Sequence, residues 1–150
     1  MDRAIYIKPC WSAADIAMLK AEFELLNQRT AVRFACDCAE RVCRHATADQ
    51  RAYAAILAGR SWADGLGSVS DARKAAFDAH AAARQTSLPS AQFAIRSAGH
   101  AAATAHVITH AVAAADYAAR SAEDTLEERA WQFAHLVHLL QALRENRMEF

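Results

Sequence analysis

Glycine and proline, the residues that interrupt helices most strongly, are scarce in this chain. Only 4 glycines and 2 prolines occur in 150 residues. β-Branched side chains, which favour strands, are also sparse. These deficits argue against an all-β sandwich or barrel.

The chain also lacks a net charge and a long apolar segment. Its 17 Lys and Arg residues balance 17 Asp and Glu residues. Because a nucleic-acid-binding protein usually shows a basic excess, nucleic acid is not a predicted partner. The central uncharged stretch over residues 101–115 is too short, and too rich in alanine and histidine, for a membrane span. Residues 1–9 contain no apolar signal-peptide core, so the predicted location is the cytoplasm.

Alanine is what the chain has in abundance, with 39 of the 150 residues. Alanine is the best helix former, and the length fits one domain. The sequence therefore predicts an all-α fold, a single-domain bundle of about five to six helices with an alanine-rich central helix. Capping residues and apolar periodicity place these helices at about 13–27, 31–46, 50 to 59 or 65, 70–86, 90–121 and 125–146. The predicted N-terminal caps of the last five are Thr30, Asp49, Ser68 or Ser70, a break with Pro89 in the first turn, and a capping box that begins at Thr125.

The four cysteines are predicted to be free thiols that fill the core. In the helix expected over 31–46, Cys36 and Cys43 point to similar sides and Cys38 points away from Cys36. Three thiolates cannot converge on a metal from one straight helix in this arrangement. We therefore interpret these residues, together with Cys10, as small core side chains rather than a zinc site.

Histidines dominate the polar residues of the expected central helix. His106 and His110 are four residues apart, a spacing that can bind a metal, but a third ligand is needed and no motif supplies one. Hydrogen-bonded core histidines are the favoured interpretation. The candidate buried polar network contains Asp37, His80, His100, His106 and His110. For Asp37, which has Arg33 and Arg41 one turn away, a solvated ion-pair surface is the alternative.

Two helical faces are candidate partner-binding surfaces. Trp131, His135 and His138 lie together on the last predicted helix, nearly opposite an expected core stripe that includes Leu126, Leu136, Val137 and Leu140. Trp131 either covers other parts of the chain or anchors a partner. On the helix over 70–86, a row is formed by Arg73, Phe77, His80 and Arg84. Its basic side chains either cover Phe77 with their stems or bind an anion.

The motifs of common enzymes are missing. The sequence has no glycine-rich phosphate loop and no Gly-x-Ser-x-Gly turn. Asp116 is the only acidic residue between Ala81 and Ser121, so paired carboxylates are absent from the expected central helix. No catalytic residue and no cofactor are predicted.

Three segments carry a family resemblance: residues 35–42, residues 72–84, and residues 97–107 with the string Ala-Gly-His-Ala-Ala-Ala-Thr-Ala-His. Together with His110, Tyr117 and residues 128–132, they resemble the all-helical immunity-protein family of bacterial polymorphic toxin systems, the fifth-type-like immunity domain. The resemblance covers about residues 31–133. It implies a cytoplasmic, non-catalytic protein that binds and neutralises a cognate toxin. Residues 1–150 are then one helical domain, with an N-terminal extension and first helix over 1–30 and a family-like core over 31–146.

Two other classes of function stay open from the residues alone. One is an alanine-rich metal-binding or enzymatic bundle that uses His80, His100, His106 and His110. The other is a homo-oligomeric structural bundle in which the Trp131 surface meets a second copy of the chain.

Overall fold

Within residues 27–148, the part of the chain described by the computed structural model, six helices form a single bundle and there are no strands. The predicted all-α class is confirmed, and the six described helices agree with the predicted five to six because the segment predicted as one helix over 90–121 contains two. The predicted helix over 13–27 and Cys10 lie outside the described residues. No helix in the described part is long and apolar enough to cross a membrane. The helices are α3 (Gln28–Ala46), α4 (Gln50–Ala63), α5 (Val69–Arg84), α6 (Pro89–Ala103), α7 (His110–Ser121) and α8 (Thr125–Met148).

Three helices begin at the predicted residues. The carboxylate of Asp49 accepts a hydrogen bond from a backbone N–H in the first turn of α4, and the Ser68 hydroxyl does the same for α5. Pro89 occupies the first turn of α6, where its missing N–H is not needed. The Asp49 and Ser68 caps satisfy backbone donors that have no partner inside the helix.

Two predicted caps are displaced by a few residues. Asn27, rather than Thr30, caps α3, because the Asn27 side chain accepts a hydrogen bond from the Thr30 N–H. At α8, the Asp124 carboxylate accepts a hydrogen bond from the Glu127 N–H, which is the role predicted for Thr125.

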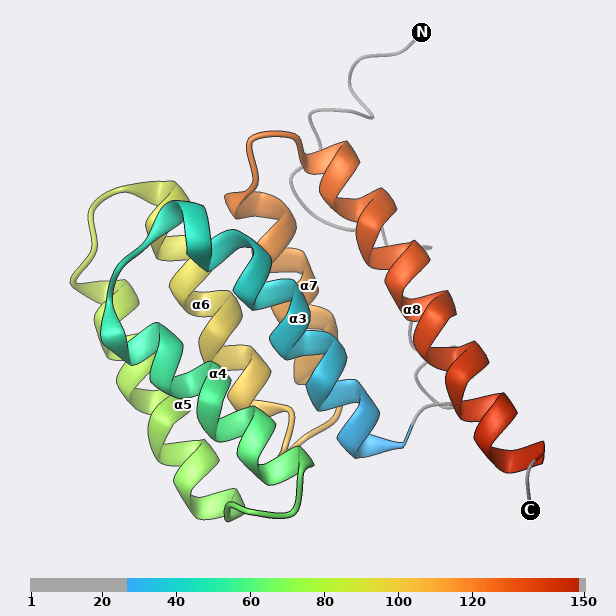
Figure 1. Cartoon of the computed structure of the whole chain (residues 1–150). Coiled ribbons are helices and arrows are strands. Elements are labelled where there is room, and N and C mark those ends of the chain that lie inside the picture. The colour runs from blue at the N-terminus through green and yellow to red at the C-terminus, as the bar shows by residue number, and fades with distance from the viewer. Residues whose placement is uncertain (1–26, 149–150) are drawn as a thin grey trace, which may run out of the picture.

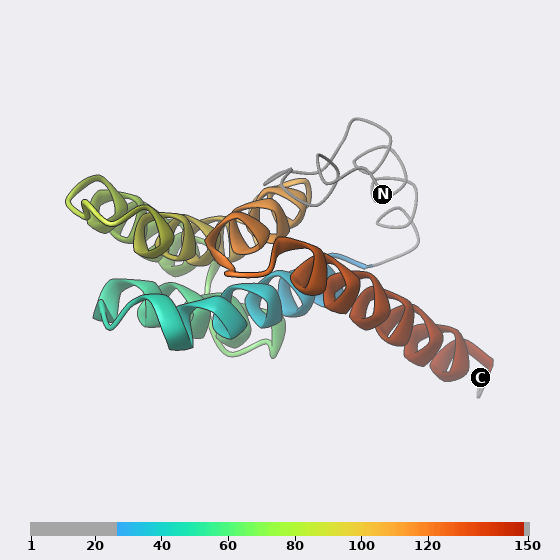
Figure 2. The same cartoon turned by 90° about the horizontal axis from the view of Figure 1, so that it is seen from above.

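Helix α6 occupies the centre of the bundle and packs against α3, α4, α5 and α7. Figures 1 and 2 show α3 and α4 together on one side of α6 and α7. Helix α8 runs along the edge of the bundle, where its main contacts are with α3 and α7, and its C-terminal end projects away. The predicted alanine-rich central helix is thus present.

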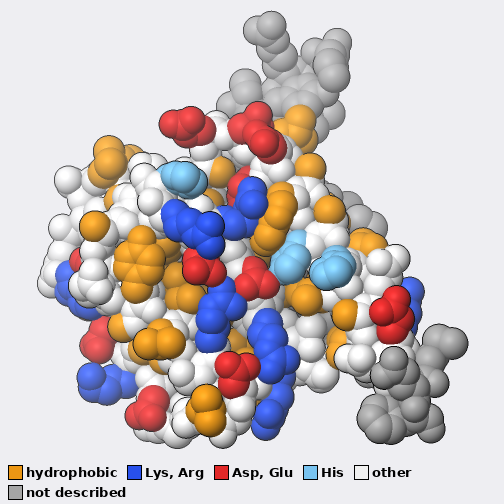
Figure 3. Space-filling model, in the orientation of Figure 1, with side chains coloured by type: hydrophobic (Ala, Val, Ile, Leu, Met, Phe, Trp, Pro, Cys, Tyr) orange, Lys and Arg blue, Asp and Glu red, His pale blue; other side chains and the backbone are white. Residues whose placement is uncertain are grey.

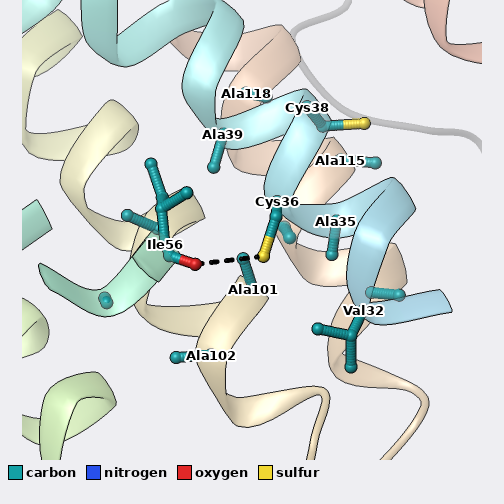
Figure 4. Packing of buried hydrophobic residues seen from close by; sticks show 14 of the residues in the cluster. Val32, Ala35, Cys36, Cys38, Ala39, Ile56, Ala101, Ala102, Ala115 and Ala118 are labelled. Atoms are coloured by element: carbon teal, nitrogen blue, oxygen red, sulfur yellow. Dashed lines mark hydrogen bonds between the residues drawn. The ribbon is translucent and has the colours of Figure 1, made fainter. Parts of the chain in front are cut away.

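Small side chains allow this close packing. Most of the buried apolar residues are alanines, and the sulfur atoms of Cys36, Cys38 and Cys43 are buried free thiols, as predicted. Figure 4 shows the Cys36 thiol pointing from α3 toward α4, where it donates a hydrogen bond to the Ile56 carbonyl. A Cβ atom on Gly59 would lie 2.9 Å from the Cys36 Sγ atom, so a larger residue there would displace the Cys36 thiol.

The prediction of one helix over 90–121 is wrong, because the chain breaks between α6 and α7. At the end of α6, the Thr104 N–H reaches both the His100 and Ala101 carbonyls, and the turn tightens. The Gln28 amide then donates hydrogen bonds to the carbonyls of Thr104 and Ala105. This long-range contact satisfies backbone acceptors that the helix leaves free. The break contains neither glycine nor proline, so no local residue indicates it.

The predicted core stripe of α8 is partly wrong. Leu136 and Leu140 are buried, as expected, but Leu126 and Val137 are exposed by 43% and 52%. Trp131, expected on the opposite side, packs against the hydrophobic core. Polar contacts between α8 and α3 determine which side of α8 faces the bundle, and they outweigh the spacing of apolar residues along α8.

Candidate functional site

Helices α5, α6 and α7 bring basic and aromatic side chains to one surface of the bundle. We call this surface the histidine face and define it as His80 and Arg84 from α5, Arg96 and His100 from α6, and His110 and Tyr117 from α7. The four-residue spacing of Arg96 and His100 places both on the side of α6 opposite its buried alanines. All of these side chains are half-buried except Arg84, which is exposed.

Close packing of α5 on α6 positions His80. A Cβ atom on Gly99 would lie 2.8–3.1 Å from three atoms of the His80 ring, so the ring lies directly against the glycine backbone. The rings of His80 and His100 meet edge to face, with their centroids 4.9 Å apart. The Nδ1 atom of His80 is buried and has no hydrogen-bond partner among the described residues. Packing, rather than a hydrogen bond from Nδ1, therefore holds this ring.

His100 joins α6 to α7. Its Nδ1 atom lies 2.9 Å from the Nδ1 atom of His110, and its ring stacks on Tyr117 with centroids 5.3 Å apart. One Nδ1 must carry a proton and donate, while the other must accept. In the neutral pair, the donor ring keeps an unprotonated Nε2. The pair can therefore take up one proton at that Nε2 without breaking the bond between the rings.

The three histidines are held in their neutral forms by burial and by one another. Burial lowers the pKa of His100 to about 4, and His80, His110 and Arg96 act in the same direction. Burial also lowers the pKa of His80, assisted by Arg96, His110 and Arg84. The pKa of His110 is lowered by burial and then by His106. Every charged neighbour that shifts these pKa values is basic.

The histidine face is also poor in acidic residues by sequence. Residues 79–115, which include the second half of α5, all of α6 and the start of α7, contain no Asp or Glu. The nearest acid along α7 is Asp116, which pairs with Arg120 at 3.1 Å. On α5, the Asp78 carboxylate pairs with Lys74. The basic side chains of the histidine face are thus gathered without an ion pair to an acid of their own helices among the described residues.

A second polar cluster, with both signs of charge, joins α8 to α3 and α4. The Asp37 carboxylate accepts hydrogen bonds from Arg60 at 2.9 Å and from the His135 Nε2 at 2.7 Å. Since a carboxylate only accepts, the proton lies on that Nε2. Burial works to raise the pKa of Asp37, but the bonds from His135 and Arg60 outweigh it, so the pKa lies below its usual value.

An arginine and a glutamate extend this cluster, which we call the α3–α8 junction. Arg41 donates two hydrogen bonds to the Glu128 carboxylate, at 2.9 and 3.2 Å. The Arg41 guanidinium also lies 4.0 Å above the Trp131 ring, which stacks on His135. Figure 3 shows basic and acidic side chains interleaved on the face that contains α3, α4 and α8.

Near this junction, a cleft of about 510 Å³ opens between the end of α3 and the start of α8. Its lining is also mixed in charge, because Arg41, Arg44 and His45 face Glu123, Glu127 and Glu128, among others. The cleft therefore does not select a partner by charge.

The structure divides the predicted buried polar network into two parts. His80, His100 and His110 meet on the histidine face, while Asp37 belongs to the α3–α8 junction. The predicted place of His106 in the buried network is corrected, because His106 is exposed in the turn between α6 and α7. The helix break removes the shared face that was predicted for His106 and His110.

The predicted partner-binding residues also separate. Trp131 and His135 have intramolecular partners in Arg41 and Asp37, and His138 is exposed beside them. Arg73 and Arg84 are exposed on α5, and His80 lies between them in sequence, half-buried. No group of three or more His, Cys, Asp or Glu side chains in the described part of the chain could hold a metal ion.

Sequence reasoning missed three contributors to these sites. Arg96 could have been found, because its spacing from His100 places both on one side of a helix. Arg60 and Glu128 could not, because their partners lie 23 and 87 positions away in the sequence. For Asp37, pairing with Arg33 and Arg41 on its own helix was the alternative interpretation, whereas Asp37 and Arg41 both bind residues of other helices.

Comparison with known proteins assigns the all-α bundle to a class, the immunity proteins. Residues 21–139 match the family described as Imm-5 like putative immunity protein. The match spans well over half of the chain, which therefore belongs to this family. The predicted resemblance is confirmed, and the matched range extends beyond the segments that carried it. No curated protein and no solved structure matches the chain.

Proposed function

We propose that this protein binds a cognate bacterial toxin in the cytoplasm and neutralises it by occluding the toxin's site, without catalysing a reaction. Membership of the immunity-protein family over residues 21–139 is the observation that carries this proposal. A rigid helical bundle suits the role, because a preformed surface loses little conformational entropy on binding.

We place the toxin contact on the α5 row, which consists of the exposed Arg73, Phe77 and Arg84 together with the half-buried His80. Phe77 is exposed by 68%, and Arg73 and Arg84 on either side of it are exposed as well. Aromatic and arginine side chains contribute most to binding at protein interfaces. Phe77, Arg73 and Val69 also line an open hollow of about 410 Å³ on this side of α5.

The α8 surface supports this proposal less well. A partner that used Trp131 or His135 would have to displace Arg41 or Asp37, to which these side chains are already bound. Only His138, of the three residues predicted there, is exposed without such a contact to Asp37 or Arg41. Among the described residues, no ion pair involves Arg73 or Arg84, so a partner that binds the α5 row displaces none there.

The test begins with co-purification of the tagged chain and identification of a stoichiometric partner. That partner is then expressed alone and together with the chain in a sensitive host. We expect growth arrest by the partner alone and growth when both are present. A partner without toxicity, or toxicity that the chain does not relieve, contradicts the proposed function.

Matched variants then locate the contact. Phe77→Ala is expected to weaken toxin binding at least about tenfold. Leu57→Ala is the control, because Leu57 on α4 is an apolar side chain exposed to a similar extent, 65%. Equal binding by both variants would move the contact away from the α5 row and leave the immunity function intact.

A further inference from the structure

The histidine face, which shares His80 and Arg84 with the α5 row, has a positive charge that no acidic side chain in the described part of the protein pairs with. Arg84 and Arg96 carry positive charge beside three histidines, and the charged groups that perturb those histidines are all basic. Arginine guanidinium groups are strong donors to carboxylates. Gathering them with histidines and without an acid costs free energy that a negative ligand would offset.

We infer that the histidine face binds carboxylate groups from an acidic segment of the toxin, and that His80, His100 and His110 take up a proton when these carboxylates bind. This inference rests on the proposed function and adds the chemistry of the partner. Arg84 and Arg96 attract the carboxylates, and the histidine cluster supplies further donors once it is protonated.

The geometry of the histidine pair explains the proton uptake. The Nδ1 atoms of His100 and His110 share one proton across 2.9 Å, and the donor ring has an unprotonated Nε2. The proton comes from solvent and binds at that Nε2, which leaves the bond between the rings in place. A bound carboxylate stabilises the resulting imidazolium and thus raises the affinity of the ring for the proton.

The groups that face this pair come from each neighbouring element. They are His80 from α5, Arg96 from α6, His106 from the turn and Tyr117 from α7. Three of the four are basic and oppose protonation of the pair in the free protein, and Arg84 from α5 opposes protonation of His80. An acidic ligand reverses that balance, whereas an apolar ligand leaves it unchanged. Proton uptake on binding is therefore specific to an acidic partner.

The experiment measures binding of a hexaglutamate peptide to the full chain, with NMR of the histidine rings as the readout. We expect the ring signals of His80, His100 and His110 to shift and their pKa values to rise. Binding is expected to be at least about threefold tighter at pH 5.5 than at pH 7.5, because proton uptake and ligand binding are linked. Absence of these shifts overturns the inference.

Paired variants separate this surface from general charge attraction. Arg84→Gln combined with Arg96→Gln should abolish the shifts. Arg33→Gln combined with Arg44→Gln removes two exposed arginines of α3 and should preserve them. Equal binding by both double variants contradicts the assigned site. Two other results also contradict it: tighter binding of a six-nucleotide oligothymidine than of hexaglutamate, or binding of inorganic phosphate as tight as that of hexaglutamate. In either case, the ligand would not be a protein carboxylate.

The toxin co-expression assay links this site to the proposed function. The Arg84→Gln and Arg96→Gln double variant is expected to lose protection of the host, while the Arg33→Gln and Arg44→Gln variant retains it. If the first variant still protects, the inference about the toxin segment fails and the immunity function stands. If the unmodified chain does not protect, the proposed function fails, and the hexaglutamate result is unaffected.

Discussion

The α3–α8 junction and the histidine face use similar residues in opposite ways. In the junction, Asp37 accepts hydrogen bonds from Arg60 and His135, and Glu128 accepts hydrogen bonds from Arg41. On the histidine face, Arg84 and Arg96 lie beside three histidines, and no acid is present over residues 79–115. The junction balances its charges within the chain, whereas the histidine face leaves them unbalanced.

This difference indicates that the junction stabilises the fold and that the histidine face is available for binding. Paired and partly buried charges hold one helix to another, and removing one partner leaves the other desolvated and unpaired. Unpaired basic groups at a half-buried surface contribute little to folding and remain available to a ligand. Substitutions in the junction are therefore expected mainly to lower the stability of the fold. Substitutions of the basic residues on the histidine face are expected mainly to weaken ligand binding.

The largest expected effect on stability is at the centre of the junction. Asp37→Ala leaves Arg60 and His135 without their shared carboxylate and should lower the free energy of unfolding by about 2 kcal/mol. Urea unfolding followed by circular dichroism measures this change. Asp64→Ala is the control and should cost less than about 0.5 kcal/mol, because the Arg33–Asp64 pair is more exposed. Equal losses would remove the distinction between the junction and an ordinary surface ion pair.

Acidification should destabilise the protein through the histidine face. The folded state holds the pKa of His100 at about 4, below the value of 6.5 for a free histidine. The unfolded state therefore binds more protons, and stability falls as the pH drops from 6.5 toward 4. After allowance for partial exposure, we expect a loss of roughly 1–2 kcal/mol, visible as a lower Tm. His100→Gln should flatten this dependence, and an unchanged slope would assign it to other groups.

The packing of α5 against α6 is tested by Gly99→Ala. The added methyl group meets the His80 ring, while alanine favours the helix, so we expect a net loss of about 1 kcal/mol. Calorimetry measures the loss, and NMR should show a displaced His80 ring. If the ring causes the effect, adding His80→Ala to this variant will restore stability relative to Gly99→Ala alone. A further loss in the double variant would contradict that explanation.

The smallest change is expected at Arg84. Arg84→Ala should alter the free energy of unfolding by no more than about 0.5 kcal/mol and raise the pKa of His80, because Arg84 is one of the groups that lower it. The contrasting variant in the junction, Arg41→Ala, should cost about 1 kcal/mol, since it leaves the buried Glu128 carboxylate unpaired. Similar costs for the two arginines would show that the histidine face also stabilises the fold.

The all-α fold could be predicted because its signals are local. Alanine content, periodicity, the caps at Asp49 and Ser68 and the first-turn position of Pro89 depend only on nearby residues, and the structure agrees with them. The break between α6 and α7 could not be predicted in this way. It depends on a hydrogen bond from Gln28, which is 76 residues away from Thr104.

The candidate sites were predictable to the extent that helix phase determines them. His80 was identified beside Arg73 and Arg84 from its place on one helix, but its contact with Gly99 depends on how two helices pack. The rotation of α8 was mispredicted because its apolar pattern competes with Glu128 and His135, which bind α3. A single sequence does not reveal which of these two influences prevails.

Because its core consists mostly of alanine, the protein differs from most in which core substitutions it tolerates. In a core of leucine and phenylalanine, most substitutions remove volume and leave a cavity, but a buried alanine can lose only one methyl group. At positions such as Ala98, Ala101 and Ala102, nearly every substitution adds atoms where helices already touch. Sequence change is therefore physically more restricted on the inward side of α6 than at the exposed positions of the bundle. The exposed residues of such a bundle can change while the packing of its helices stays the same.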